Sequence, residues 1–459
     1  MSESYETKRY GADKIALLGL FIVALVIARF IIASSSAIVL SGPIKLDYSG
    51  LSVSMPMGNG WQSEKQWKFQ NNSFDLSSVF NPGSGSVTAL VQCRYLLAVE
   101  MSGAEARLKQ KASAVGGEIA ETGRGRLDKL TVDWAHIKKP KTLFDMFFGT
   151  VRLPNNRQFD IEVHQATGDS KFAEQVFKRI AESLEFEDNQ LLAAGSKIIG
   201  EIKSKGLESF LKKEVRETFF LIKDSRRHTT GFTMDLLGCS FARLQNEGEA
   251  TEVDAEGQSN IEGASFYYIR DRYNQEQATL FKSDNSFDEF TWKSETSGPR
   301  GRSGVEIVLE RDGIMTVKRF NAATREKIYR PGPAAIPEMF LEFTLSELLE
   351  SDKKEIIVDV IDSEGKITPT LISRIEGKDK TIEEEEAVYL LSLELLDGRE
   401  FSEQVSLDRQ KHISRILLRQ NNIYILERSS AEDVSRQFPE HSEYILQKNK
   451  MQGQNEPEH

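Results

Sequence analysis

The chain contains 459 residues, of which 39% are hydrophobic and 28% are charged, and its formal net charge is −11. This length suits about two or three folded domains. The acidic balance excludes nucleic acid as the expected partner, because phosphate backbones are bound by basic surfaces.

The first feature in chain order is an apolar segment near the N-terminus. Residues 15–40 contain a run, interrupted only by Arg29 among charged residues, that is long enough for a helix of about 20 residues to cross a bilayer. We therefore expect a transmembrane anchor at 15–40. It follows a cytoplasmic tail at 1–14, which contains the cations Lys8, Arg9 and Lys14. This orientation predicts a single-pass membrane protein whose bulk is extracytoplasmic.

A cleaved signal peptide is the alternative for this segment. The uninterrupted apolar run at 15–28 has the length of a signal-peptide core, and Ser35-Ser36-Ala37 supplies small residues for cleavage. Apolar character continues beyond that core, which favours the uncleaved anchor. Both interpretations place the remaining residues outside the cytoplasm.

Residues 45–187 are predicted to form a small α+β domain, in which helices cover an antiparallel sheet. Strand-like runs recur along this segment, and helices are predicted at Gly103–Val115 and Ser170–Phe186. Asp169 or Ser170 can cap the second helix. Its apolar residues recur at every fourth position, namely Phe172, Val176, Ile180 and Leu184. This stripe is typical of a helix that packs on a sheet.

An opening strand precedes Met55-Pro56 and Gly60-Trp61, and a β-meander then leads to an amphipathic helix that ends in Ser183-Leu184-Glu185-Phe186. This order of elements resembles the PsbP/DcrB-type fold. The resemblance implies a small α/β sandwich in a non-enzymatic, exported or assembly-related protein. It implies no catalytic residues.

A linker helix is predicted at 188–206, and residues 207–428 are predicted to be almost entirely β. Asp312-Gly313 and Asp397-Gly398 lie between apolar runs and predict tight hairpin turns. One helix with an apolar face, Pro337–Glu350, interrupts the strands.

Many consecutive strands around one helix predict a large antiparallel sheet that curls around the helix or closes into a barrel. This layout is similar to the LolA/LppX half-barrel family, whose curved sheet wraps a helix and leaves an apolar trough. A two-sheet sandwich is the alternative. Residues 429–459 are predicted to form a largely disordered C-terminal tail. The predicted fold class is therefore α+β: an N-terminal transmembrane helix, a small α/β sandwich and a large antiparallel β domain.

Four residues are candidates for contact with lipid or a partner protein. Arg226 and Arg227 form a basic cluster between two predicted strands and could bind lipid phosphates, whereas a solvated turn is the simpler interpretation. Trp61 and Trp67 lie close to the predicted anchor and could sit at the lipid interface. Burial in the domain core is the favoured alternative for the tryptophans.

The sequence predicts no catalytic, cofactor or metal site. The 6 histidines lack the spacing of metal ligands. Ser209 and Lys212 match a Ser-x-x-Lys pattern without the accompanying motifs of serine acyltransferases. The acidic run 383–386 is more typical of a solvated loop than of a cation site. Cys93 and Cys239 are expected to be separate buried thiols rather than a disulfide.

The leading hypothesis is a non-enzymatic envelope protein that binds a partner protein, or an apolar ligand such as lipid, in its β domain. An enzyme whose carboxylates are not contiguous in sequence and a scaffold without a pocket are the alternatives. A carrier predicts an apolar cavity largely free of titratable groups. An enzyme predicts a cleft with titratable groups of shifted pKa, and a scaffold predicts a filled interior.

Overall fold

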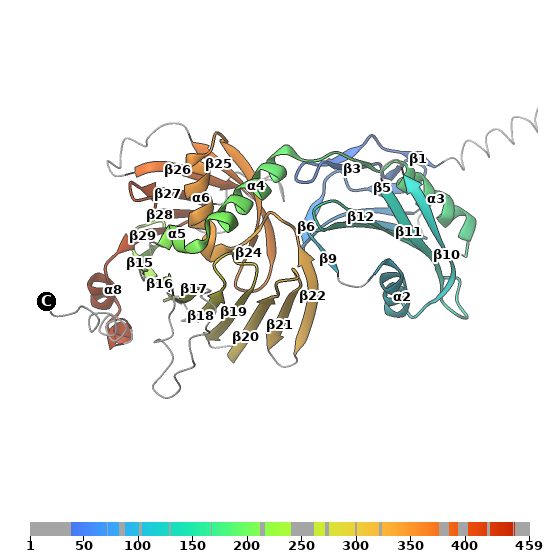
Figure 1. Cartoon of the computed structure of the whole chain (residues 1–459). Helices are drawn as coiled ribbons and strands as arrows, with labels where there is room; N and C mark the ends of the chain where they lie inside the picture. The colour runs from blue at the N-terminus through green and yellow to red at the C-terminus, as the bar shows by residue number, and fades with distance from the viewer. Residues whose placement is uncertain are drawn as a thin grey trace, which may run out of the picture.

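The computed structural model shows two lobes that lie side by side (Figure 1). The structure describes residues 38–70, 72–81, 88–100, 103–127, 130–166, 168–211, 216–239, 261–270, 275–298, 301–320, 324–375, 385–392, 403–419, 423–443 and 445. The N-terminal lobe extends to about residue 187, and the C-terminal lobe contains a sheet of 16 strands.

The predicted fold class, α+β behind an N-terminal transmembrane helix, is wrong. Strands dominate the described residues, and large sheets organise both lobes. Within the parts of the chain that the structure describes, no helix is both long and apolar enough to span a membrane. Residues 15–37 of the predicted span lie outside those parts. At its end, Val39–Leu40 is strand β1, which pairs with β4 (Pro56–Met57). The transmembrane and signal-anchor assignments are therefore corrected.

An antiparallel sheet of 8 strands forms the centre of the N-terminal lobe, in the order β10-β11-β12-β13-β8-β7-β5, with β6 beside β7. Its strands are β5 (Trp61–Ser63), β6 (Lys68–Gln70), β7 (Ser73–Phe80), β8 (Ala89–Leu96), β10 (Glu118–Leu127), β11 (Leu130–Lys138), β12 (Asp145–Leu153) and β13 (Arg157–Gln165). A smaller sheet joins β2 (Ile44–Leu46), β3 (Leu51–Val53) and β14 (Glu185–Phe186).

Two helices cover opposite faces of the 8-stranded sheet. Helix α3 (Ser170–Glu182) packs Val176 and Phe177 against the main core, and the Asp169 side chain caps its first turn by accepting from Phe172 N. Helix α2 (Ala104–Ala114) packs Leu108 on the other face, against Phe148. The apolar stripe and the Asp169 cap explain why α3 begins where the sequence predicts it. The predicted end at Phe186 is wrong, because the helix ends at Glu182 and Glu185–Phe186 is strand β14.

The large sheet follows helix α4 (Gln190–Lys205), which Asn189 caps, and helix α5 (Leu207–Leu211). Its strands from the middle of the order are β15 (Arg216–Lys223), β16 (Thr229–Cys239), β17 (Ile261–Ile269), β18 (Gln275–Ser283), β19 (Phe290–Gly298), β20 (Gly301–Leu309), β21 (Met315–Phe320) and β22 (Arg325–Pro331). The remaining strands are β23 (Ala335–Pro337), β24 (Glu355–Ile361), β25 (Ile367–Ile375), β26 (Glu385–Ser392), β27 (Glu403–Asp408), β28 (Ile413–Arg419) and β29 (Ile423–Ser429). A short 3-10 helix, η1 (Glu338–Phe340), leads into α6 (Leu341–Glu350).

The predicted hairpin at Asp312-Gly313 is confirmed. It joins the paired strands β20 and β21, and Gly313 adopts a φ of 81°, a value that glycine tolerates without strain. The predicted turn at Asp397-Gly398 lies outside the described residues.

The strand order shows that the large sheet curls on itself. Strands β22 and β23 lie at or next to opposite ends of this order, yet the chain passes from Pro331 to Ala335 with three residues between them. Such a link spans at most roughly 14 Å. The two margins of the sheet therefore approach one another, and Tyr329 Oη donates to Gly365 O in the β24–β25 turn at 2.7 Å. The sheet is β-barrel-like.

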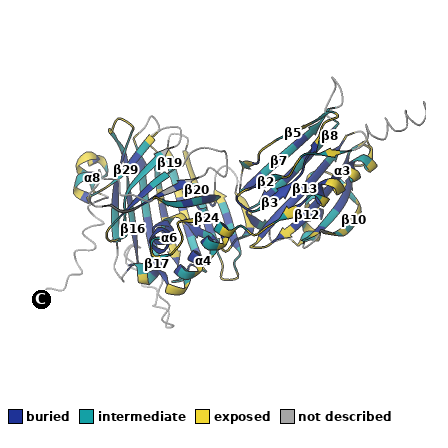
Figure 2. Ribbon diagram, turned by 90° about the horizontal axis from the view of Figure 1, so that it is seen from above, coloured by how far each residue is buried: buried dark blue, intermediate teal, exposed yellow. Residues whose placement is uncertain are grey.

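Helices occupy both faces of this curled sheet (Figure 2). On the concave face, α4 and α6 share a core with β24 and its neighbours. On the convex face, helix α8 (Ala431–Gln437) and the 3-10 helix η2 (Pro439–His441) lie next to β15, β16 and β17. Phe438 packs on Phe232 with ring centroids 4.9 Å apart.

The two lobes share a strand and a buried ionic cluster. Strand β9 (Ala98–Glu100), which belongs in sequence to the N-terminal lobe, pairs with β22 and completes one edge of the large sheet. Beside it, Arg157 of β13 forms an ion pair with Asp359 of β24 and donates to Tyr48 Oη at 2.8 Å. These contacts hold the lobes together through both backbone and side-chain hydrogen bonds.

Candidate functional site

The register of the large sheet separates an inward face from an outward face. Leu237 of β16 belongs to the main core, whereas its neighbours Met234 and Phe232 pack under α8. Residues directly opposite one another in antiparallel strands point to the same face. Asp235, Ser265 and Thr279 are opposite one another on β16, β17 and β18, so all three share the inward face with Leu237.

One end of the curled sheet is filled. Phe340 packs its ring against Phe281 of β18 at 5.1 Å and against Phe343 of α6 at 5.7 Å. Tyr389 of β26 donates to Leu345 O at 3.0 Å. All five side chains are buried within the same apolar core. At this end, α6 occupies the space that an apolar trough would need.

At the other end the inward side chains are polar and only half-buried. Asp235, Ser265 and Gln277 keep part of their surface accessible, although each points to the concave side. Gln277 donates to Ser294 Oγ and to Ser363 Oγ, both at 2.9 Å. The packed core therefore does not extend through this end of the sheet, which we call the open end.

Three carboxyl groups from distant parts of the sequence face the interior near the open end. They belong to Asp235 of β16, Glu338 of η1 and Glu403 of β27. Burial is the largest cause that raises the pKa of each group. The pKa reaches about 7 for Asp235 and about 8 for Glu338. Near neutral pH the side chains of Asp235 and Glu338 can therefore donate as well as accept hydrogen bonds.

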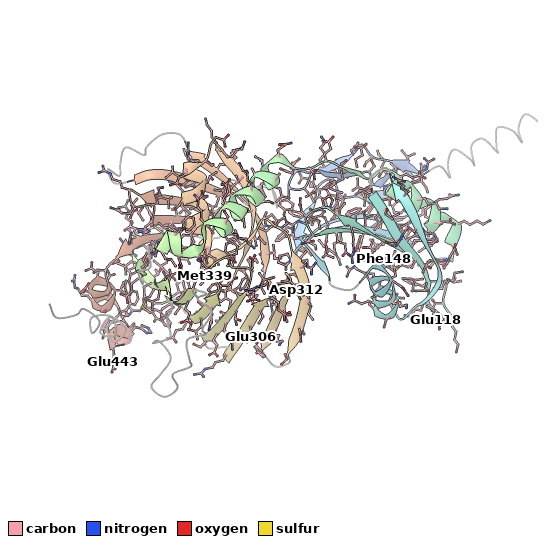
Figure 3. All side chains as sticks on the ribbon, in the orientation of Figure 1. Glu118, Phe148, Glu306, Asp312, Met339 and Glu443 are labelled. Atoms are coloured by element: carbon pink, nitrogen blue, oxygen red, sulfur yellow. The ribbon has the colours of Figure 1, made fainter. Side chains whose placement is uncertain are left out.

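Mutual repulsion contributes to the shift at Glu338. The carboxylates of Glu403, Asp362 and Asp235 each raise its pKa further. Glu338 lies deep in the lobe, yet its side chain retains an exposed surface. Its neighbour Met339 lies in the interior of the lobe (Figure 3), 3.5 Å from where a Cβ on Gly263 would be.

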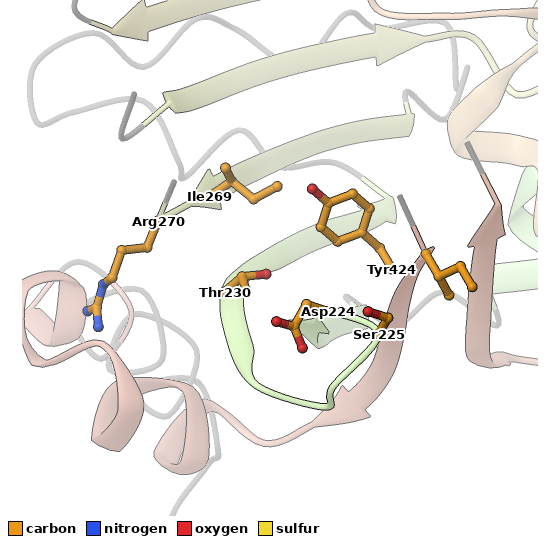
Figure 4. A pocket seen from close by; sticks show the side chains of 7 residues that line it. Asp224, Ser225, Thr230, Ile269, Arg270 and Tyr424 are labelled. Carbon is orange, nitrogen blue, oxygen red and sulfur yellow. The ribbon is translucent and has the colours of Figure 1, made fainter. Parts of the chain in front are cut away.

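A cavity of about 300 Å³ lies at the rim of the open end (Figure 4). It is lined by Asp224, Ser225, Thr230, Ile269, Arg270, Ile423 and Tyr424. The turn between β15 and β16 forms one wall. Asp224 holds that turn by accepting hydrogen bonds from the backbone N of Arg226 at 2.8 Å and of His228 at 2.9 Å.

The strand register places one residue of the rim cavity on the same face as one of the interior carboxyls. Tyr424 of β29 lies opposite Leu418 of β28, and Leu418 lies opposite Glu403 of β27. The three side chains therefore share one face across three strands. Leu418 and Tyr424 are half-buried, so the inward face between the cavity and Glu403 consists of partly accessible side chains.

Arg226 and Arg227, two of the predicted contact residues, lie on the β15–β16 turn beside this cavity. Both are exposed, and Arg227 has a φ of 64°. Neither side chain lines the cavity, although their neighbours Asp224 and Ser225 do. The predicted basic cluster is thus a solvated turn that borders the rim.

Trp61 and Trp67 lie in the other lobe, far from the open end. Trp67 is buried, donates to Ile44 O at 3.3 Å and packs against Phe159. Trp61 is half-buried between Phe80 and Phe172. The structure brings neither tryptophan to the arginine turn. The sequence analysis missed the interior carboxyls, because only the sheet register assigns Asp235 to the inward face.

The remaining candidate residues from the sequence, possible metal ligands, Ser209 and Cys93, form no recognisable site within the described residues. Among the described residues, no group of three or more His, Cys, Asp or Glu side chains is arranged to hold a metal ion. Ser209 Oγ donates to Gly206 O at 2.7 Å within a short helix, and Lys212 lies outside the described residues. Cys93 is a buried free thiol.

No protein-family model matches the chain, and no curated protein matches it. Among solved structures, it is similar to a β-barrel-like protein of the domain of unknown function DUF1849 from Brucella abortus, with 12% identity and a TM-score of 0.32. The match covers 47% of this chain and 96% of that chain. Such a similarity carries no functional argument. The β-barrel-like character of the sheet rests on its strand order, and the likenesses to PsbP/DcrB and LolA/LppX proteins stay predictions.

Proposed function

We propose that the protein binds an amphipathic small molecule of the lipid class at the open end of its curled sheet. The observation that supports this most is the shared face of Tyr424, Leu418 and Glu403, which leads from the rim cavity to a protonatable carboxyl. Ligand sites commonly combine apolar walls with a few placed polar groups. Here Leu418 and Tyr424 provide apolar surface, and the neutral carboxyls provide hydrogen-bond donors.

The polar lining changes the kind of ligand expected from the sequence. A purely apolar ligand would desolvate Asp235 and Glu338 without replacing their hydrogen bonds, at a cost of about 1–3 kcal/mol for each unsatisfied group. An amphipathic ligand with a hydroxyl, ester or carboxyl group can satisfy them. The α6 side chains fill the opposite end, so the ligand enters only part of the interior.

The test is native mass spectrometry with lipid extraction on the full-length protein and on two matched variants. Leu418→Trp blocks the inward face of β28, and Leu417→Trp adds the same bulk on the outward face of the same strand. We expect a near-stoichiometric amphipathic molecule on the wild type and on Leu417→Trp, and its loss from Leu418→Trp. A wild-type protein free of ligand, or equal loss from both variants, contradicts the proposal.

Catalysis is the second candidate, because the raised pKa of Asp235 and Glu338 suits general acid–base chemistry. Incubating the extracted ligand with fresh protein separates the two functions. A change in ligand mass that Glu338→Gln abolishes identifies an enzyme, whereas unchanged ligand identifies a binding protein. The extracytoplasmic location and an envelope partner protein stay predictions.

A further inference from the structure

A second cavity, of about 350 Å³, lies where the two lobes meet. Its lining includes Lys203 of α4, Asp288 of the β18–β19 turn, Arg311 and Asp312 of the β20–β21 turn, Arg330 of β22 and Asn156 of the N-terminal lobe. We call it the junction cavity. Phe287 and Phe290, both buried, form an apolar part of its wall.

Most charged groups of the junction cavity already have partners. Lys203 Nζ lies 2.7 Å from Asp288 Oδ1, and Arg311 Nε lies 3.3 Å from Glu289 Oε1. Asp312 Oδ1 accepts from Ile314 N at 2.9 Å, which stabilises the hairpin turn. These contacts leave neither of the lining carboxylates, Asp288 and Asp312, without a partner.

Arg330 is the exception. Its side chain is half-buried, and its Nε is fully buried with no hydrogen-bond partner among the residues that the structure describes. No carboxylate within the described chain forms an ion pair with it. A buried guanidinium nitrogen without an acceptor is costly, so such atoms normally have a hydrogen-bond partner. Arg330 is therefore the lining cation that has no ion-pair partner among the described residues.

We propose that the junction cavity binds a small oxyanion, a carboxylate or a phosphate group, through the guanidinium of Arg330. Arginine favours these anions because its planar fork of donors matches their oxygens. The volume is at the lower end of the range for small-molecule sites, and the Phe287–Phe290 wall accommodates an apolar part of the ligand. The ligand would touch both lobes, because Asn156 also lines the cavity and donates to Pro331 O at 3.2 Å.

This inference is independent of ligand binding at the open end. Isothermal titration of the full-length protein with inorganic phosphate and, separately, with benzoate distinguishes a phosphate from a carboxylate preference. The variant Arg330→Met keeps the apolar stem of the side chain and removes the charge. The matched control is Arg325→Met on the same strand, because Arg325 is exposed and does not line the cavity.

We expect saturable binding of at least one probe by the wild type and by Arg325→Met. Arg330→Met should weaken it by roughly ten- to a hundredfold, the range expected for a hydrogen bond to a charged group. Circular dichroism and the unfolding midpoint establish that the variant is folded, and we expect it to be at least as stable as the wild type. No saturable binding of either probe by the wild type, or unchanged binding by Arg330→Met, overturns the proposal.

Discussion

Arg157 and Asp359 form an ion pair between the two lobes in which the residues are only 1% and 0% exposed. Tyr48 completes the cluster by accepting from the same guanidinium. Both Nε and Nη1 of Arg157 lack a hydrogen-bond partner among the described residues, so Asp359 and Tyr48 are its main support.

We predict that Asp359→Asn lowers the free energy of unfolding by about 3–5 kcal/mol, because it leaves a buried guanidinium without its counter-charge. The double variant Arg157→Met/Asp359→Leu should recover most of that loss, since it removes both charges. Urea unfolding followed by circular dichroism measures both values. A loss below about 1 kcal/mol for the single variant would show that water reaches the pair.

Helix α4 approaches β24 so closely that one glycine is essential. A Cβ on Gly195 would lie 1.9 Å from the Ile357 carbonyl oxygen, whereas a Cβ on Gly200 in the same helix meets nothing within 4 Å. Gly195→Ala should therefore cost about 1–3 kcal/mol through overpacking. Gly200→Ala should stabilise by about 0.5–1 kcal/mol, because alanine favours the helix. Thermal unfolding of the two variants tests the contrast, and similar midpoints would contradict this packing.

The interior carboxyls predict an unusual dependence of stability on pH. The pKa of Glu338 is raised to about 8 and that of Asp235 to about 7, so the folded protein holds protons that the unfolded chain releases at lower pH. Their contribution is complete below about pH 4 and is lost as the pH rises through 7 and 8. The urea concentration at the unfolding midpoint of the wild type should therefore decrease as the pH is raised from 5 to 8.

Glu338→Gln provides the control for this prediction. Glutamine cannot ionise, so the variant should show a smaller decline over the same pH range. The difference between the two profiles isolates the carboxyl from other titrating groups. Parallel profiles for wild type and variant would mean that water solvates Glu338 as it does a surface residue.

Cys93 is predicted to be unreactive in the folded protein. Its thiol is buried beside Met55, with Sγ and Sδ 3.8 Å apart, and burial raises its pKa well above the usual value. In a Cys239→Ser background, a thiol reagent should label no cysteine in buffer and one in urea. Rapid labelling of the native protein would contradict the packing of β8.

Much of the fold follows from local patterns. The stripe through Phe172 and Val176 and the Asp169 cap predicted α3, and the Asp312-Gly313 turn predicted a hairpin. The many strands around one helix also predicted a curled sheet. These signals depend on residues that are neighbours in sequence or on the number of strands, so a single sequence is enough to reveal them.

The candidate site depends on contacts between residues distant in sequence. In the sequence, Asp235 follows the apolar Met234, as a solvent-facing residue of a strand would. Only the register with β17 assigns Asp235 to the concave face of the sheet. Glu338 stands at the start of an apolar helix, where acids are common for other reasons. No sequence pattern marks Arg330. Its proposed role depends on the partners that the nearby carboxylates have in the folded chain. The order of the predicted strands and helices likewise suggested an α+β class, since it does not reveal how many strands join one sheet.

The pairing of β9 with β22 has a consequence for how the chain is made. The N-terminal part of a chain emerges from the ribosome first, so Glu100 is synthesised long before its partner Tyr329. Until then, the edge formed by Ala98–Glu100 is unpaired and available to other strands. Pairing over such a separation is entropically slow. The N-terminal lobe can therefore fold early, but the seam between the lobes is among the last parts of the molecule to form.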